Sequence, residues 1–194
     1  MSEADTTRRD ILRTIAAAAL AGPMGVAAAQ EVHQATAKEA AATSGVYVPK
    51  ALTAHEFATL KKLCELIVPG ASKGGAAEFI DLLASQNPDL AAIYTGGLGW
   101  LDRRMHSEFD TTFLAAKMEE QTAMLDRIAY RDADAPELSA GIRFFAWARR
   151  MTVDAYYTSA AGIRELEYLG NKGMSEFRVP QEAIEYAVRR SGLG

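Results

Sequence analysis

The sequence predicts an all-α protein, a single irregular helical bundle of about six helices, and three observations lead to this class. Apolar residues recur at three- and four-residue spacing through successive segments, which places them on one face of a helix. Of the six prolines, all but the first follow residue 30, and each of these stands at a boundary between such segments. Only isolated fragments alternate apolar and polar residues as the strands of a sheet do. We therefore expect one helical domain over residues 52–194.

Residues 1–29 have the pattern of a twin-arginine signal peptide. Arg8 and Arg9 form the motif, and an uncharged, alanine-rich run begins at Ile15. The small residues that a signal peptidase requires end at Ala29. The run is shorter than the about 20 apolar residues of a membrane-spanning helix. We therefore expect export through the twin-arginine (Tat) translocon to the periplasm, with cleavage after Ala29.

The segment between this signal and the domain, residues 30–51, is rich in alanine, threonine and polar residues and shows no clear apolar stripe. We expect it to be a flexible arm. The net charge of the chain is −4, and this weakly acidic balance argues against nucleic acid as a partner.

Local start and stop signals define the first two helices of the domain. Thr53 followed three residues later by Glu56 is a capping box, and Pro69-Gly70 ends the helix that it begins. Gly74-Gly75 then leads into a second helix over residues 76–86.

The third helix begins at Asn87-Pro88, a cap followed by a first-turn proline. Within it, the run Gly96–Gly99 resembles a phosphate-binding loop only superficially, because no lysine follows. We expect a kink or a close packing point there. A fourth helix is expected over residues 113–129 and a last one after Pro180.

The segment 136–158 is expected to be the central and most buried helix. At 3.6 residues per turn it carries two apolar stripes on roughly opposite sides. The first stripe contains Leu138, Ile142, Phe145, Val153 and Tyr156, and the second contains Phe144, Trp147 and Met151. A helix that is apolar on two sides is buried on both, or is shared with another chain.

Arg149 falls within the first stripe, where an unpaired charge would be costly. Two explanations stay open: a salt bridge to a carboxylate of another helix, with Asp81 or Asp102 as candidates, or presentation of the guanidinium to a partner subunit.

The sequence offers little chemistry of its own. The three histidines, His33, His55 and His106, lie far apart and suggest no metal site. The only cysteine, Cys64, excludes an internal disulfide; it is either a small buried hydrophobe or an exposed thiol that pairs with a partner. No dinucleotide motif and no haem or iron–sulfur cysteine set is present. We expect no catalytic residue and no cofactor in this chain.

The run TVDAYYTSAAGIRELEYLGN, residues 152–171, resembles the C-terminal signature of the gluconate 2-dehydrogenase subunit 3 family. The resemblance continues upstream through residues 52–56, 67–69 and 76–83, so it covers most of residues 52–171. One departure is Glu167, where we expect the family to prefer glycine.

The resemblance implies a small helical subunit that accompanies a large FAD-dependent dehydrogenase of the glucose–methanol–choline type. Such a large subunit would oxidise a sugar, a sugar acid or a glycoside, as a glucoside 3-dehydrogenase does, and would often pass electrons to a cytochrome c subunit. FAD and the catalytic base would belong to that partner. Tat export carries folded proteins, so we expect a chain without a cofactor motif to carry a cofactor-binding partner with it. The function expected is therefore a non-catalytic small subunit for export, folding and stability. The alternative is a free-standing periplasmic helical ligand-binding protein.

We expect the large subunit to pack on the second stripe or on the adjoining signature, because tyrosine and tryptophan are favoured at interfaces. The candidate interface residues are Phe144, Trp147, Met151, Tyr156, Tyr157, Tyr168 and Asn171. The other interpretation of the tyrosines is that they close the core beneath the loop.

Overall fold

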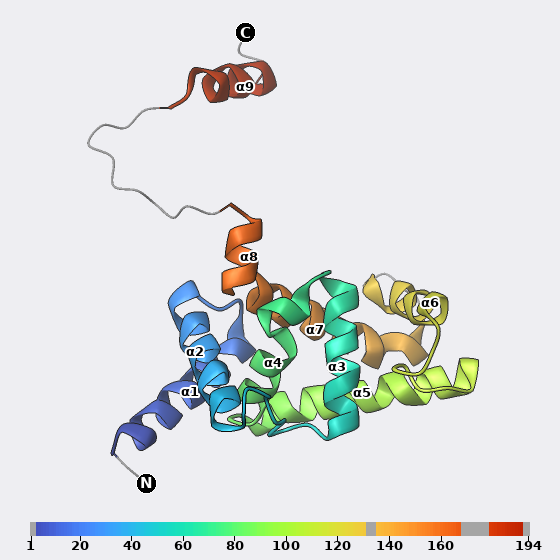
Figure 1. Cartoon of the computed structure of the whole chain (residues 1–194). Helices are drawn as coiled ribbons and strands as arrows, with labels where there is room; N and C mark the ends of the chain where they lie inside the picture. The colour runs from blue at the N-terminus through green and yellow to red at the C-terminus, as the bar shows by residue number, and fades with distance from the viewer. Residues whose placement is uncertain (1–2, 131–134, 168–178, 192–194) are drawn as a thin grey trace.

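The computed structural model describes residues 3–130, 135–167 and 179–191, and every regular element in these ranges is helical. The α-helices are α1 (Glu3–Ala21), α2 (Val26–Ala42), α3 (Ala54–Ile67), α4 (Ala76–Ala84), α5 (Pro88–Phe109), α6 (Met118–Ala129), α7 (Ser139–Tyr157), α8 (Ala160–Glu165) and α9 (Gln181–Ser191). Two short 3₁₀ helices, η1 (Ala71–Gly74) and η2 (Pro136–Leu138), precede α4 and α7. The predicted all-α class is confirmed (Figure 1).

The helix at the centre of the bundle is α4, and the expectation that the 136–158 segment would be the most buried was wrong. Every residue of α4 except Glu78 is buried. Helices α1, α2, α3, α5 and α7 all pack against it. Helix α7 forms a wall of the same core, in contact with α3, α4, α5 and α6. A short helix rich in alanine takes the centre because neighbours can approach it closely from every side.

Helices α5 and α7 cross through two glycine contacts. A Cβ atom placed on Gly97 would overlap the ring of Phe144, and one placed on Gly141 would overlap the indole of Trp100. Each glycine therefore provides the space for an aromatic ring of the other helix. Helix α5 continues without interruption through the glycine run, which provides the close packing point that the sequence suggested.

The predicted caps are confirmed. The Thr53 hydroxyl accepts from the Glu56 N–H at 3.2 Å, and the Glu56 carboxylate accepts from the Thr53 N–H at 2.8 Å. At the start of α5, the Asn87 side chain accepts from the backbone N–H groups of Asp89 and Leu90.

The segment that we expected to be a flexible arm, residues 30–51, is helical as far as Ala42. Helix α2 buries Ala29, Val32, Ala35 and Thr36 and packs against α4. Alanine has the highest helix propensity of all residues. Its small side chains also let α2 lie close to α4, which explains why no stripe of large residues announces the helix.

The chain between α2 and α3 is held by Asp81, a fully buried carboxylate of α4. Asp81 accepts hydrogen bonds from the Tyr47 hydroxyl at 2.8 Å and from the backbone N–H groups of Lys50, Ala51 and Leu52 at 2.7–3.1 Å. Burial and the Asp81 carboxylate together raise the pKa of Tyr47. A buried carboxylate without a cation is thus satisfied by four donors.

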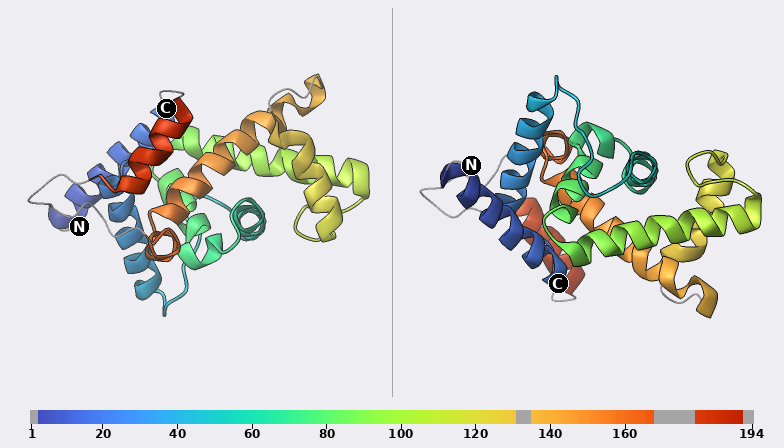
Figure 2. Two further views of the ribbon diagram at one scale, coloured as in Figure 1. Left: turned by 90° about the horizontal axis from the view of Figure 1, so that it is seen from above. Right: turned by 90° about the horizontal axis from the view of Figure 1, so that it is seen from below.

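The predicted signal segment contains helix α1, which lies beside α2 at one side of the bundle while α6 lies at the opposite side (Figures 1 and 2). Its apolar face packs on the core, with Leu12, Ile15, Ala16 and Ala19 buried. None of the helices that the structure describes is long and apolar enough to cross a membrane.

Candidate partner interface

The signature that ends α7 is organised around Tyr156, which is buried. Its ring lies against the turn after α3, where Gly70 adopts a φ of 90°. A Cβ atom on Gly74 would lie 2.8 Å from the Tyr156 ring and 2.7 Å from the Ser159 hydroxyl. The Tyr156 hydroxyl donates to the Glu165 carboxylate at 2.5 Å. Tyr156 therefore closes the core, as one of the two interpretations predicted.

The turn that receives Tyr156 is fixed from within by Glu65. The Glu65 carboxylate accepts from the Gly70 N–H at 2.7 Å, and from the N–H and hydroxyl of Ser72 at 3.1 and 2.7 Å. These donors, the Ser72 hydroxyl first, lower the pKa of Glu65. These hydrogen bonds hold the turn against which the signature packs.

Helix α8 follows directly and is capped by Ser159, whose hydroxyl accepts from the Gly162 N–H at 3.1 Å and donates to the Tyr156 carbonyl. Gly162 has no space for a Cβ atom, which would overlap that carbonyl. Glu167, after α8, has a φ of 50°. This left-handed conformation favours glycine, which accounts for our expectation of glycine at that position.

The predicted interface residues fall into three groups. Phe144, Met151 and Tyr156 are buried within this chain, so in the conformation described their side chains do not form an exposed surface. Phe144 also makes an edge-to-face contact with Tyr94, so this part of the second stripe faces α5. Trp147 and Tyr157 are only partly buried and remain candidates. Tyr168 and Asn171 lie outside the described residues.

Trp147 belongs to a small polar and aromatic surface of α7. The Arg150 guanidinium lies 4.2 Å from the centre of the indole ring. Arg150 also donates to the Ala19 carbonyl at 2.6 Å, and the Asp154 carboxylate accepts from the Met24 N–H at 3.4 Å. Burial raises the pKa of the Asp154 carboxyl. This surface therefore holds the end of α1 and the link to α2.

The residues of the predicted export signal differ in their exposure to solvent. Arg9 is exposed and lines a cleft with Arg13, Lys50 and the start of α5. The side chain of Arg8 lies outside the described ones. Ala29, the predicted cleavage residue, is fully buried in the first turns of α2.

Arg149 is exposed, and the salt bridge that we considered to Asp81 or Asp102 is not formed. Asp81 is occupied by the donors described above. Asp102 accepts from the Phe113 N–H at 2.9 Å and lies 2.5 Å from His55 Nε2. Arg149 lies next to the exposed part of the stripe at Val153, so its charge is solvated.

Cys64 is buried, and its thiol accepts from the Thr152 hydroxyl at 3.3 Å. Burial raises the pKa of the thiol to about 12. Of the two interpretations, the small buried hydrophobe is the one that this structure supports.

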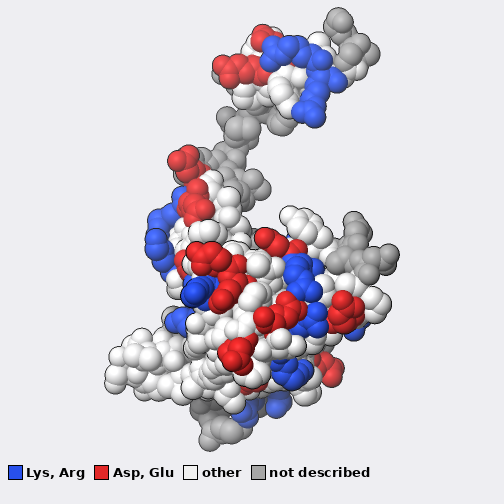
Figure 3. Space-filling model, turned by 90° about the vertical axis from the view of Figure 1, so that its right-hand side faces the viewer, with Lys and Arg blue, Asp and Glu red and all other residues white. Residues whose placement is uncertain are grey.

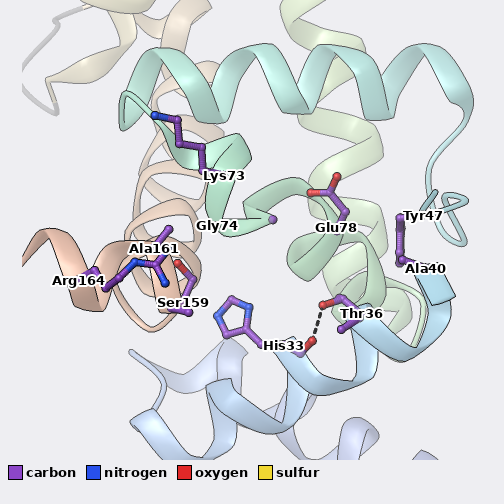
Figure 4. A pocket seen from close by; sticks show the side chains of 13 residues that line it. His33, Thr36, Ala40, Tyr47, Lys73, Gly74, Glu78, Ser159, Ala161 and Arg164 are labelled. Carbon is purple, nitrogen blue, oxygen red and sulfur yellow. Dashed lines mark hydrogen bonds between the residues drawn. The ribbon is translucent and has the colours of Figure 1, made fainter. Parts of the chain in front are cut away.

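A groove of about 340 Å³ lies between α2, the η1–α4 turn and α8. Figure 4 shows His33 and Thr36 on one wall, Gly74 and Glu78 on another, and Ser159 with Arg164 on the third. His33 Nε2 lies 3.1 Å from the Thr158 hydroxyl and its ring contacts Phe79, so this histidine joins α2 to the end of α7. Burial lowers the pKa of His33.

Acidic and basic side chains are interspersed on the face of the molecule that carries α3 and α6, and Figure 3 shows no large area of one sign on that face. The ion pairs of the described residues include Lys61–Glu78 and the contacts of Glu108 with Arg104 and Arg127. Within the described ranges, no group of three or more histidine, cysteine or carboxylate side chains is placed to hold a metal ion.

Comparison with known families identifies the domain. A family model described as gluconate 2-dehydrogenase subunit 3 matches residues 54–174, a range that begins with α3 and extends beyond α8. Helices α1, α2 and α9 lie outside this range. Comparison with curated proteins and with solved structures gave no match. The family is that of a subunit of a dehydrogenase complex, which implies a partner subunit. The capped α3, the turn fixed by Glu65 and the signature around Tyr156 thus form the domain of a member of the gluconate 2-dehydrogenase subunit 3 family.

Proposed function

We propose that this chain is the non-catalytic small subunit of a periplasmic FAD-dependent dehydrogenase that oxidises a sugar, a sugar acid or a glycoside. Its role is to carry the export signal for the catalytic large subunit and to support the folding and stability of that subunit. The large subunit holds FAD and the catalytic base.

The family match over residues 54–174 is the observation that carries this proposal. The sequence adds two facts: it contains a twin-arginine pattern at Arg8 and Arg9, and it contains no dinucleotide, haem or iron–sulfur motif. A Tat signal on a chain without a cofactor of its own is explained if the signal serves a partner that loads its cofactor in the cytoplasm.

The export role is tested by replacing Arg8 and Arg9 together with lysine, which preserves charge and removes the motif. Both this chain and the FAD-dependent dehydrogenase activity are expected to remain in the cytoplasm. The matched control is Arg13→Lys, outside the arginine pair, which should leave both in the periplasm. Normal periplasmic activity in the double variant would show that the flavoprotein has its own route.

The surface that contacts the partner is tested by comparing two aromatic residues of α7. Trp147→Ala is expected to weaken binding of the large subunit about thirtyfold, the equivalent of about 2 kcal/mol for a buried interface aromatic, with little change in this chain's melting temperature. Phe144→Ala is the contrasting variant, because it removes a core ring and should lower the melting temperature. Unchanged affinity of a folded Trp147→Ala chain would place the interface elsewhere.

One observation favours a second function, that of a free-standing ligand-binding protein. The groove beside His33 has the volume of a small-ligand site. Glu78 is one of the residues that line it, and its buried Oε2 atom has no hydrogen-bond partner among the described residues. Calorimetric titration of the isolated chain with neutral sugars and sugar acids tests it. Saturable heat that Glu78→Gln abolishes would support this function over the first.

A further inference from the structure

The face of the bundle under α1 has a chemistry that indicates what else could bind there. Arg150 donates to the carbonyl of Ala19, in the last turn of α1. The last four carbonyls of a helix lack intrahelical partners and form the negative end of its dipole. Arg150 therefore receives the C-terminal end of a helix.

The rest of the contact is weak or generic. The apolar face of α1 consists of the buried residues Leu12, Ile15, Ala16 and Ala19 and of Leu20, which is partly buried against the core. Two of these five residues are alanines, which bury little area. The second polar contact, from the Met24 N–H to Asp154, is long at 3.4 Å.

Two further facts connect this face to the partner. Trp147, the half-buried aromatic residue of α7, stacks on the same Arg150 guanidinium, so the exposed surface continues directly into the covered one. The helix that covers the face is also outside the range that the family model matches, whereas α4 and α7 lie within it.

We propose that the face formed by α4 and by Trp147, Arg150 and Asp154 of α7 is the docking site of the large subunit, which inserts a helix that ends against Arg150, and that α1 occupies this site until the large subunit displaces it. This inference rests on the proposed function and specifies where the partner binds.

The displacement has a consequence for export. In the free chain the apolar residues of the signal are packed on the core, and Ala29 is fully buried. The signal helix and the large subunit compete for one site, so each lowers the affinity of the other for that site by the same factor. Binding of the large subunit therefore releases the signal helix from the core. The export signal thus becomes accessible when the complex has assembled.

The first test uses the full-length wild-type chain and the large flavoprotein subunit. Limited proteolysis reports on the link at residues 22–25, which α1 holds in place when it is docked. Addition of the large subunit is expected to accelerate cleavage at this link about tenfold. Unchanged or slower cleavage at saturating large subunit would overturn the proposal.

The second test changes α1 alone. Ala16 is buried and Ala17 is exposed, so Ala16→Glu should release α1 whereas Ala17→Glu should not. In a chain whose α1 is released, the docking face is already free, and α1 no longer competes for it. The affinity of Ala16→Glu for the large subunit should therefore rise about tenfold or more, while the affinity of Ala17→Glu should match that of the wild type. The pair Leu12→Glu and Ile11→Glu repeats the comparison one turn earlier, in case the first variant misfolds.

The third test changes the face itself. Arg150→Ala should release α1, as Ala16→Glu does, yet weaken binding of the large subunit, because the partner helix loses the same donor. If α1 and the large subunit share one site, both variants should show faster proteolysis of the link, but the affinity for the large subunit should rise in Ala16→Glu and fall in Arg150→Ala. Equal affinities in both released chains would overturn it, as would self-association of Ala16→Glu in place of flavoprotein binding. A large subunit that binds none of the chains, the wild type included, would refute the proposed function as well.

Discussion

The chain before α3 is attached to the bundle at two places, and the two attachments differ in strength. At residues 47–52, Asp81 is fully buried and accepts four hydrogen bonds, none longer than 3.1 Å. At residues 19–24, Asp154 is only partly buried and accepts one long bond, and Arg150 adds a second contact. Both sites use an aspartate to hold backbone N–H groups. The first attachment is therefore the stronger one, and the second is the one that the proposed displacement of α1 would break.

The largest expected effect is at the first attachment. In Asp81→Asn, the side-chain NH2 group replaces one carboxylate oxygen and faces backbone N–H groups, so buried N–H groups of residues 50–52 lose an acceptor. The free energy of unfolding should therefore fall by about 3 kcal/mol. Urea denaturation followed by circular dichroism measures it. Asp126→Asn, at an exposed position, is the control and should change stability by less than about 0.5 kcal/mol. Equal losses for both would remove the distinction between the two attachments.

A smaller effect is expected from Tyr47→Phe, which removes one of the four donors and leaves the ring in place. The free energy of unfolding should fall by about 1 kcal/mol, the net value of a typical buried hydrogen bond. Thermal unfolding of Tyr130→Phe, an exposed tyrosine, gives the baseline for losing a hydroxyl. If Tyr47→Phe is as stable as wild type, the backbone donors alone hold the segment.

A still smaller effect should depend on pH. Burial lowers the pKa of His33 below its ordinary value of 6.5, so the fold favours the neutral ring. This contribution is fully present above pH 6.5 and is lost as the pH falls through the lowered pKa. The stability of the wild type relative to His33→Gln should therefore decline below pH 6.5, as measured by denaturation at a series of pH values. His106→Gln, at an exposed site, is the comparison variant.

The smallest effect is expected at the second attachment. Burial raises the pKa of Asp154, so its ionised form at pH 7 is slightly unfavourable in the fold. Asp154→Asn keeps an acceptor for the Met24 N–H and should change the free energy of unfolding by less than about 0.5 kcal/mol, toward greater stability. The same denaturation measurement as for Asp81→Asn makes the comparison direct. A loss as large as that at Asp81 would mean that this attachment is also permanent.

The features that the sequence predicted best are those whose contacts join residues close together in the chain. The caps at Thr53 and Asn87 were identified correctly because their hydrogen bonds join residues no more than three apart. Glu167 was noted as a departure, and its φ of 50° shows that the position does require an unusual backbone.

Contacts between distant segments could not be predicted in the same way. Asp81 lies in an apolar helix, but its donors lie about 30 residues earlier in an irregular segment, and no periodicity connects them. We had considered it as a partner of Arg149. Helical angle alone placed Arg149 in a stripe and could not show that this part of α7 faces solvent.

The same limit affected the candidate interface. The second stripe was identified correctly as an apolar side of α7, but Phe144 is covered by α5 and not by another chain. The glycine run of α5 was the available signal, since Gly97 makes the space for that ring. Only the crossing of the two helices shows that the signal and the ring belong together.

The position of Asp81 also has a mechanical consequence. A pulling force on the N-terminus would first peel away α1 and α2 and extend the first 46 residues, on the order of 150 Å of chain. It would then reach residues 47–52, where four hydrogen bonds to one carboxylate share the load. The hydrogen bonds to Asp81 would therefore bear the tension on the N-terminal segment before it reached α3 and the folded core behind it.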